Sequence, residues 1–191
     1  SVLVMGFGYA AKTFHVPFLQ AMDAYSIAGV VSSVPAKVQG VLPGVSVYNS
    51  FEQAIADDNF DLVVITTPNH LHAEQAEAVL RAGCHVLVEK PFTLSSERAE
   101  QLVALAAQLN KQLCVFHNRR FDGDFLTLKQ LIAEQAVGNI KRLESRFDRF
   151  RPTPRKRWRE NAGPGSGIFW DLGPHLIDQV VQLFGMPQQV S

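Results

Sequence analysis

The sequence predicts an α/β fold: a doubly wound parallel sheet followed by the beginning of a second, smaller α+β domain. Two observations carry this prediction. Continuously apolar runs, too apolar for half-exposed strands, alternate with helical patterns from residue 2 to about residue 116. This alternation of strands and helices then stops, and the rest of the chain shows two helical patterns and one long strand-like run. We therefore expect one domain over residues 1–120 and an incomplete second domain over residues 121–191.

The composition narrows the class of protein. The 191 residues are 47% hydrophobic and 19% charged, and 18 Lys and Arg balance 18 Asp and Glu. These values are typical of a soluble globular protein, without a net charge that would favour nucleic acid or membrane. The sequence shows no apolar stretch long enough to span a bilayer and no signal peptide. We expect Cys84 and Cys114 to be buried, reduced thiols of a cytoplasmic protein.

The first strand-like run, Val2–Met5, leads directly into a glycine turn. The residues Gly6-Phe7-Gly8, with Ala11 three positions later, form the pattern G-x-G-x-x-A. In a Rossmann fold this turn binds the pyrophosphate of a dinucleotide. Gly6 permits a tight turn, Gly8 lets phosphate oxygens approach the backbone, and Ala11 lets the next helix pack closely on the sheet. The helix N-terminus then faces the phosphates.

The remaining elements follow from pattern and from local signals. Further strands are predicted over residues 27–31, 45–48, 62–66, 85–88 and 113–116. The first helix should be interrupted near Pro17, because proline breaks a helix interior. Ser50 and Gln53 match a capping box, and Ser95 or Ser96 can cap a later helix. The Pro- and Gly-rich segment between residues 33 and 44 is expected to be a loop.

Residues 121–191 should contain helices around residues 125–132 and 169–184, and residues 140–150 alternate like one long strand. A single strand does not form a stable sheet. We therefore expect the chain to be a fragment, or to obtain further strands from a partner. Apolar side chains such as Leu143, Phe147, Phe150 and Leu183 should then stay partly exposed, and His175 should be open to solvent.

The carboxyl ends of the predicted strands are polar, and this is where open α/β sheets bind ligands. Any one of these segments could be an ordinary polar loop, but together they predict one crevice. Besides the glycine turn, they are Ser32-Ser33, Thr67-Pro68-Asn69, Glu89-Lys90-Pro91 and His117-Asn118-Arg119.

The end of the second strand bears on the choice of cofactor. An NAD-binding site usually places an acidic residue there to bind the ribose 2′-hydroxyl. Ser32 and Ser33 occupy the position instead, with Lys37 shortly after. A carboxylate would repel a 2′-phosphate, whereas hydroxyls and an ammonium group would hold it. We expect NADP rather than NAD, the alternative being that Ser33 only begins a turn toward Pro35.

Several of these motifs together resemble the glucose–fructose oxidoreductase/inositol dehydrogenase (Gfo/Idh/MocA) family, over the whole chain. The matching segments are Gly6-Phe-Gly8, Thr67-Pro-Asn69 with His72, Glu89-Lys90-Pro91, and Trp170-Asp-Leu-Gly-Pro-His175 with Asp178. The segments 115–122, 147–152 and 157–159 resemble the NADP-dependent scyllo-inositol 2-dehydrogenase branch. Because this family's proteins continue into a large open sheet, the resemblance implies a C-terminally truncated chain and a homo-oligomer at full length.

The resemblance implies three catalytic side chains. Lys90 matches the lysine that contacts the reacting oxygen, His175 the general acid/base, and Asp171 the acid beside them. Asp171 and His175 are one helical turn apart, and a histidine that titrates near neutrality suits removal of a hydroxyl proton. Lys90 can stabilise the alkoxide charge that develops. The alternatives are a zinc site, for which a third ligand is not evident, and a merely structural His175.

The glycine turn, the strand ends and the matched motifs together give the expected binding residues. Those expected for the cofactor are Gly6, Phe7, Gly8, Tyr9, Ala10, Ala11, Ser32, Ser33, Lys37, Thr66, Thr67, Pro68, Asn69, His72, Glu89, Lys90 and Asn118. Those expected for the substrate are Lys90, Arg119, Trp158, Asp171 and His175, and no metal is expected.

The function predicted is hydride transfer between NADP and a cyclic polyol or sugar, with scyllo-inositol as the leading candidate. The rival hypothesis is a non-catalytic NADP-binding sensor, because a fold does not determine function. The presence of Lys90, Asp171 and His175 together favours the enzyme. Nine basic residues lie between Lys141 and Arg159, but acidic residues and prolines interrupt them. A solvated surface near the active site is therefore preferred to a nucleic-acid strip.

Overall fold

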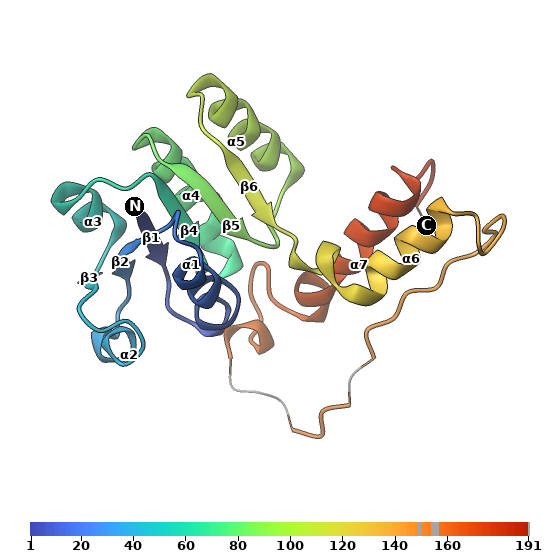
Figure 1. The fold of residues 1–191 in the computed structure, drawn as a ribbon, viewed down its shortest axis with the longest axis horizontal. Helices are drawn as coiled ribbons and strands as arrows, with labels where there is room; N and C mark the ends of the chain where they lie inside the picture. The colour runs from blue at the N-terminus through green and yellow to red at the C-terminus, as the bar shows by residue number, and fades with distance from the viewer. Residues whose placement is uncertain (149, 154–156, 191) are drawn as a thin grey trace. The chain divides into compact units, whose positions relative to one another are not determined.

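The structure is a computed structural model, and it describes residues 1–148, 150–153 and 157–190 (Figure 1). The chain divides into two compact units, Ser1–Phe116 and His117–Ser191.

The first unit contains one six-stranded parallel sheet. Its strands are β1 (Val2–Met5), β2 (Ile27–Val31), β3 (Ser46–Tyr48), β4 (Leu62–Ile65), β5 (His85–Glu89) and β6 (Leu113–Phe116). The spatial order is β3-β2-β1-β4-β5-β6, and every pair is parallel. This is the strand order of the Rossmann fold, in which the order reverses beside β1. The predicted doubly wound sheet is confirmed.

Helices cover both faces of the sheet. They are the π-helix η1 (Ala11–His15), α1 (Val16–Ala21), α2 (Pro35–Gln39), α3 (Phe51–Asp57), the 3₁₀-helix η2 (Asn69–Leu71), α4 (His72–Arg81) and α5 (Ser96–Gln108). The interruption expected near Pro17 is present, since Pro17 lies in the first turn of α1, directly after η1. The loop predicted around Pro35 was wrong. Pro35 starts a short helix, because the first helical position needs no backbone N–H.

Side chains that alternate along the strands divide the core into two layers. One layer packs beneath α3, α4 and α5 and includes Leu3, Met5, Val63, Ile65, Val79, Leu80 and Leu102. The other lies beneath η1, α1 and α2 and includes Val2, Val4, Val64, Ala11, Val16, Leu19 and Val38. The central strands are therefore buried on both faces, as their continuously apolar sequences predicted.

Two predicted helix caps are present. Ser50 Oγ accepts a hydrogen bond from the backbone N–H of Gln53 at 3.2 Å. Gln53 Oε1 in turn accepts from the N–H of Asn49 at 2.9 Å, one residue before the cap. Ser95 Oγ accepts from the N–H of Arg98 at 3.2 Å. These contacts satisfy backbone groups that the helices themselves leave without partners.

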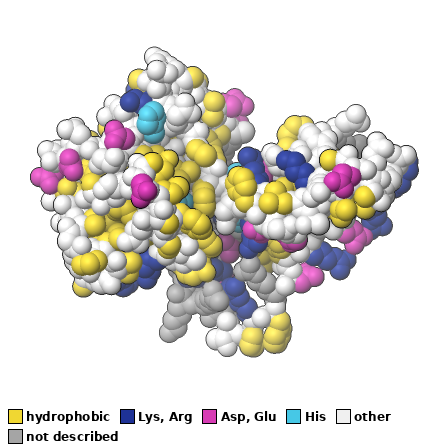
Figure 2. All heavy atoms as spheres, in the orientation of Figure 1, with side chains coloured by type: hydrophobic (Ala, Val, Ile, Leu, Met, Phe, Trp, Pro, Cys, Tyr) yellow, Lys and Arg dark blue, Asp and Glu magenta, His cyan; other side chains and the backbone are white. Residues whose placement is uncertain are grey.

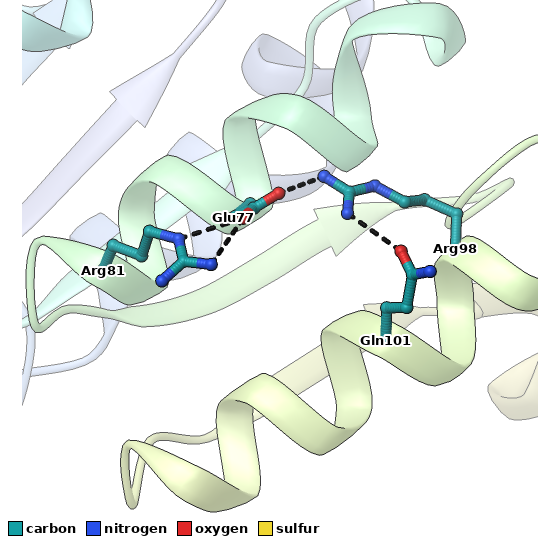
Figure 3. Close-up of polar contacts among 4 residues, drawn as sticks. All are labelled: Glu77, Arg81, Arg98 and Gln101. Carbon is teal, nitrogen blue, oxygen red and sulfur yellow. Dashed lines mark hydrogen bonds and ion pairs between the residues drawn. The ribbon is translucent and has the colours of Figure 1, made fainter.

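A polar network joins α4 to α5 on the outside of the first unit (Figure 3). Glu77 accepts from Arg81 Nε at 2.9 Å and Nη2 at 2.8 Å on its own helix, and it forms an ion pair with Arg98 of α5. Arg98 Nη1 also donates to Gln101 Oε1 at 3.1 Å. The hydrogen bonds from Arg98 and Arg81 hold the pKa of Glu77 below its usual value.

The second unit is mainly helical in the residues described. It contains η3 (Asn118–Phe121), α6 (Gly123–Ala133), η4 (Trp158–Glu160) and α7 (Ile168–Phe184). The long strand predicted over residues 140–150 was wrong for residues 140–148 and 150, which form no strand, and Arg149 lies outside the described residues. A strand needs a neighbour, and Leu143 and Phe147 instead line a cavity of about 250 Å³ together with residues of α6 and α7.

Hydrophobic side chains reach the surface in both units (Figure 2). In the second unit Phe150 is 92% exposed. Leu143, Phe147 and Leu183 are partly exposed, as predicted. None of the helices in the described segments combines the length and the hydropathy that crossing a membrane requires.

The two cysteines differ in their environment. Cys84 is buried, its thiol donates to the Phe60 carbonyl at 3.1 Å, and burial raises its pKa. The expectation that Cys114 is also buried was wrong, because Cys114 is exposed. It lies in β6 at the edge of the sheet, where its neighbours Leu113 and Val115 pack against the core and its own side chain points to the other face.

Candidate functional site

The glycine turn after β1 lies against the end of β4. Gly6 has φ +86°, and its N–H donates to the carbonyl of Val31 at 3.0 Å. A Cβ at Gly6 would meet the carbonyl carbon and Oγ1 of Thr66 at 3.2 Å. Thr66 Oγ1 also donates to the Gly6 carbonyl at 3.0 Å. Both the backbone angle and the close approach explain why glycine occupies this position.

The next glycine faces open space. A Cβ at Gly8 would meet no atom within 4 Å, so the backbone there is accessible to a ligand. Ala11 is fully buried in the core layer beneath η1, which allows this helix to approach the sheet. Phe7 is buried in the same layer, so its ring packs in the core. Tyr9 is exposed and packs edge-on against Phe14.

The serines after β2 lie where a nucleotide ribose is expected. Ser32 continues the pairing with β3, since its N–H donates to the Tyr48 carbonyl at 2.9 Å. Its Oγ accepts from the N–H of Val34 at 3.2 Å and retains its own hydrogen for donation. Ser33 and Lys37 are exposed, the latter on α2. Two hydroxyls and one ammonium group are thus available at this end of the sheet.

His72 joins the loops after β4 and β5. The ring is completely buried, with Nδ1 2.8 Å from the carbonyl oxygen of Pro91 and Nε2 2.9 Å from that of Thr67. Thr67 Oγ1 donates to Gln75 Oε1 at 2.5 Å, and Asn69 is buried in η2. His72 therefore supports the backbone of two loops predicted to contact the cofactor, instead of directing its ring toward a ligand.

Two buried side chains form a hydrogen bond at the end of β5. Nε2 of His15, the last residue of η1, is 2.9 Å from Oε1 of Glu89, and the two side chains are 2% and 11% exposed. The His15 ring also packs on Phe116, with centroids 4.4 Å apart. Glu89 and Phe116 are register partners on β5 and β6. His15 thus contacts two adjacent strand ends.

Lys90 follows this pair directly. It is the first residue after β5, its side chain is buried, and it precedes the cis Lys90–Pro91 peptide bond. A lysine is rarely buried unless its ammonium group has a function or a partner. Its position after the strand matches the carboxyl edge at which ligands bind in this fold.

In the second unit, α7 carries a carboxylate held by basic side chains. Asp178 accepts two hydrogen bonds from Arg120, at 2.6 and 2.8 Å, and His117 Nδ1 lies 3.9 Å away. Burial alone would raise the pKa of Asp178, but the Arg120 hydrogen bonds and the nearby histidines hold it below its usual value. Asp178 therefore fixes η3 to α7 as a charged group.

Asp171 lies among arginines within the same unit. Its carboxylate is 3.3 Å from Arg157 Nη2 and 3.6 Å from Arg159 Nε. The Arg159 guanidinium lies 4.9 Å above the ring of Trp158 in η4. Asp171 is thus attached to the segment that contains Trp158, a residue predicted to contact substrate.

His175 lies one turn after Asp171 on α7 and is buried, contrary to the expectation that it would be open to solvent. The His175 and Phe147 rings pack edge-on, with their centroids 6.5 Å apart. The Cζ atom of Arg119 lies 4.8 Å from the centroid of the same Phe147 ring. Arg119 also donates to Asp122 at 2.6 Å. Phe147 therefore contacts both Arg119 and His175, and Asn118 is the first residue of η3, one position before Arg119.

Sequence reasoning missed several of these residues. His15 carried no spacing signal, because its partner is 74 positions away. Arg120 and Arg157 lie in segments that carried the family resemblance, but the sequence did not predict that each pairs with a carboxylate of α7. Within the residues that the structure describes, no group of three or more His, Cys, Asp or Glu side chains could hold a metal ion.

Comparison with known families gives two matches that together span most of the chain. The family model described as "Oxidoreductase family, NAD-binding Rossmann fold" matches residues 1–117. The model of the GFO/IDH/MocA C-terminal domain matches residues 125–191.

Individual relatives agree with these matches. An uncharacterized oxidoreductase, YdgJ of Escherichia coli, is 50% identical over 98% of this chain and 54% of its own length. The scyllo-inositol 2-dehydrogenase (NADP(+)) IolW of Bacillus subtilis is 39% identical over 98% of the chain and 52% of its own length. The solved structure described as "putative oxidoreductase yvaA" from Bacillus subtilis has a TM-score of 0.90 and 40% identity, covering 97% of this chain and 53% of that one. The chain thus spans about half the length of these relatives.

Proposed function

The chain belongs to the GFO/IDH/MocA family of oxidoreductases with an NAD-binding Rossmann fold, and from that membership we propose that the protein transfers a hydride between NADP and a CH–OH group of a cyclic polyol or sugar. The observation that carries the proposal is the glycine turn. Gly6 lies tightly against Thr66, while the space over Gly8 is open. This combination suits the binding of a dinucleotide pyrophosphate at the end of β1.

The preference for NADP rests on the end of β2. Ser33 and Lys37 are exposed, and Ser32 retains a donor hydrogen. These groups complement a ribose 2′-phosphate, and this position lacks the acid that would bind a free 2′-hydroxyl. One relative, the 39% identical protein from Bacillus subtilis, is named as an NADP(+)-dependent scyllo-inositol 2-dehydrogenase.

The catalytic roles follow from the chemistry of alcohol oxidation. The nicotinamide supplies the hydride acceptor when it is bound. His175 accepts the hydroxyl proton as the carbinol becomes a carbonyl, and Lys90 stabilises the negative charge that develops on the oxygen. In the reverse direction His175 returns the proton.

The remaining roles concern position. Asp171 is the acidic residue one helical turn before His175 on α7, and its carboxylate is paired with Arg157. Arg119 offers hydrogen-bond donors to polyol hydroxyls, and Trp158 offers an apolar face to the sugar ring. An inositol-like substrate suits this set because it combines a ring with several hydroxyl groups.

The test is a substrate screen with full-length protein. NADPH formation is followed by nicotinamide absorbance with a panel of inositols and aldoses, and each substrate is repeated with NAD. We expect turnover with NADP and at least one cyclic polyol or sugar, and slower turnover with NAD. Tight NADPH binding without turnover on any member of the panel would instead favour the non-catalytic sensor.

A further inference from the structure

The buried pair of His15 and Glu89 takes no part in the chemical step proposed above, although Glu89 is among the residues expected to bind the cofactor. Both residues are nearly inaccessible, and their contact is 2.9 Å long. A buried polar side chain is costly unless it has a hydrogen-bond partner, and His15 is the partner of Glu89. Because a carboxylate only accepts hydrogen bonds, Nε2 of His15 carries the hydrogen of this contact.

The pair connects two parts of the proposed site. His15 ends the π-helix that begins at Ala11, directly after the glycine turn. Glu89 is the last residue of β5, and Lys90 follows it. Through one contact the element that holds the dinucleotide is therefore fixed to the backbone that carries Lys90. π-helical turns occur frequently at functional sites.

The aromatic neighbour adds a second constraint. Phe116 is the register partner of Glu89 on β6. The centroids of the Phe116 and His15 rings are 4.4 Å apart, with an angle of 49° between the ring planes. His15 is thus held by packing as well as by its hydrogen bond to Glu89. It thereby contacts the last residues of two paired strands, β5 and β6.

We propose that His15 is a positioning residue for hydride transfer: through Glu89 it fixes Lys90 relative to the glycine turn. This inference rests on the proposed function. Hydride transfer requires the carbinol carbon to lie at a defined distance and orientation from the nicotinamide. Lys90 contributes to this alignment because it holds the carbinol oxygen in position. Loss of the pair should therefore impair the chemical step more than the binding of either ligand.

The test compares three variants in full-length protein. His15→Leu removes the partner of Glu89, and His15→Gln keeps a side-chain N–H donor. His85→Leu is the matched control, because His85 lies at the opposite end of the same strand and accepts a hydrogen bond from Gln112 at 3.0 Å. For each protein, kcat, KM, NADPH affinity and thermal stability are measured. Amide hydrogen exchange at Glu89 and Lys90 is followed by NMR.

We expect His15→Leu to lower kcat by about 10–100-fold, the scale expected from misplacement of a catalytic group by about 1 Å. KM and the NADPH dissociation constant should change far less. His15→Gln should recover most of the turnover, and exchange at Lys90 should be faster only in His15→Leu. His85→Leu should alter stability without altering kcat.

If His15→Leu does not fold, Glu89→Met replaces it, since this variant removes the acceptor of the His15 hydrogen bond without leaving an unpaired carboxylate. Unchanged kcat and unchanged exchange at Lys90 in a folded variant overturn the inference. Equal loss of turnover in His15→Gln and His15→Leu would also overturn it. If wild type turns over no polyol, the proposed function fails, while exchange at Lys90 still decides whether His15 holds this residue in place.

Discussion

Thr66 and Gly6 lie in direct contact at the carboxyl ends of β4 and β1. Thr66 Oγ1 donates to the Gly6 carbonyl at 3.0 Å, and a Cβ at Gly6 would lie 3.2 Å from this side chain and from the Thr66 carbonyl carbon. The turn that faces the proposed cofactor is therefore fixed to the central strand of the sheet. Its shape depends on packing against β4 as much as on its own glycines.

Gly6→Ala should destabilise the first unit more than the same change at Gly83. Both glycines have positive φ, +86° and +83°, but of the two only Gly6 has neighbours within 4 Å of the place that a Cβ would occupy. The left-handed backbone alone costs about 1–2 kcal/mol, and the contact with Thr66 should add about 1–3 kcal/mol. Urea unfolding of both variants measures the difference. Equal destabilisation of the two variants would show that the contact with Thr66 does not add to the cost of a Cβ at Gly6.

Gly8→Ala should leave the fold unchanged and weaken NADPH binding. A Cβ at Gly8 meets no protein atom, so the free energy of unfolding should change by less than about 0.5–1 kcal/mol. The methyl group would nevertheless occupy space that the pyrophosphate needs. Nicotinamide fluorescence titration should show at least about a tenfold loss of affinity, or about 1.4 kcal/mol. Unaltered affinity would place the phosphates elsewhere.

Ser32→Asp should erase or reverse the preference for NADP. A carboxylate at the end of β2 repels the 2′-phosphate and can bind the 2′-hydroxyl of NAD. Ser26→Asp, which adds the same charge just before β2 at the opposite end of the strand, is the control. Titration with NADPH and NADH gives the ratio of affinities. A wild-type preference for NAD would contradict the assignment of Ser32, Ser33 and Lys37.

Glu77 should make the stability of the first unit depend on pH. Arg98 and Arg81 lower its pKa in the folded state, so its ion pairs stabilise the fold above the unfolded value of about 4.3. This contribution is lost as the pH falls through the folded pKa. Glu77→Gln should therefore cost about 1 kcal/mol or less at neutral pH and almost nothing in acid. A cost that is the same at both pH values would contradict this role.

Much of the first unit could be predicted from the sequence because its signals are local. Continuous apolar runs identified every strand of the sheet within one residue at either end, and Ser50 and Ser95 marked helix starts. The glycine pattern located the turn now seen against Thr66. The helix at Pro35 was missed because proline indicates a loop as readily as a first helical turn.

The rest depends on contacts between distant residues. The pairing of His15 with Glu89 spans 74 positions and follows from the fold alone. Alternation in residues 140–150 predicted a strand, but Leu143 and Phe147 line a cavity with helices instead. The exposure of Cys114 follows from the edge position of β6, which strand order decides. Local pattern does not contain this information.

The most direct test of the proposed reaction is turnover by full-length His175→Ala, compared with wild type on the polyol that the screen identifies. If His175 accepts the hydroxyl proton, kcat should fall by about 10²–10⁴-fold. NADPH affinity should stay within about threefold, because the histidine acts on the substrate. Turnover equal to wild type in this variant would contradict the assignment of His175 as the acid/base of the reaction.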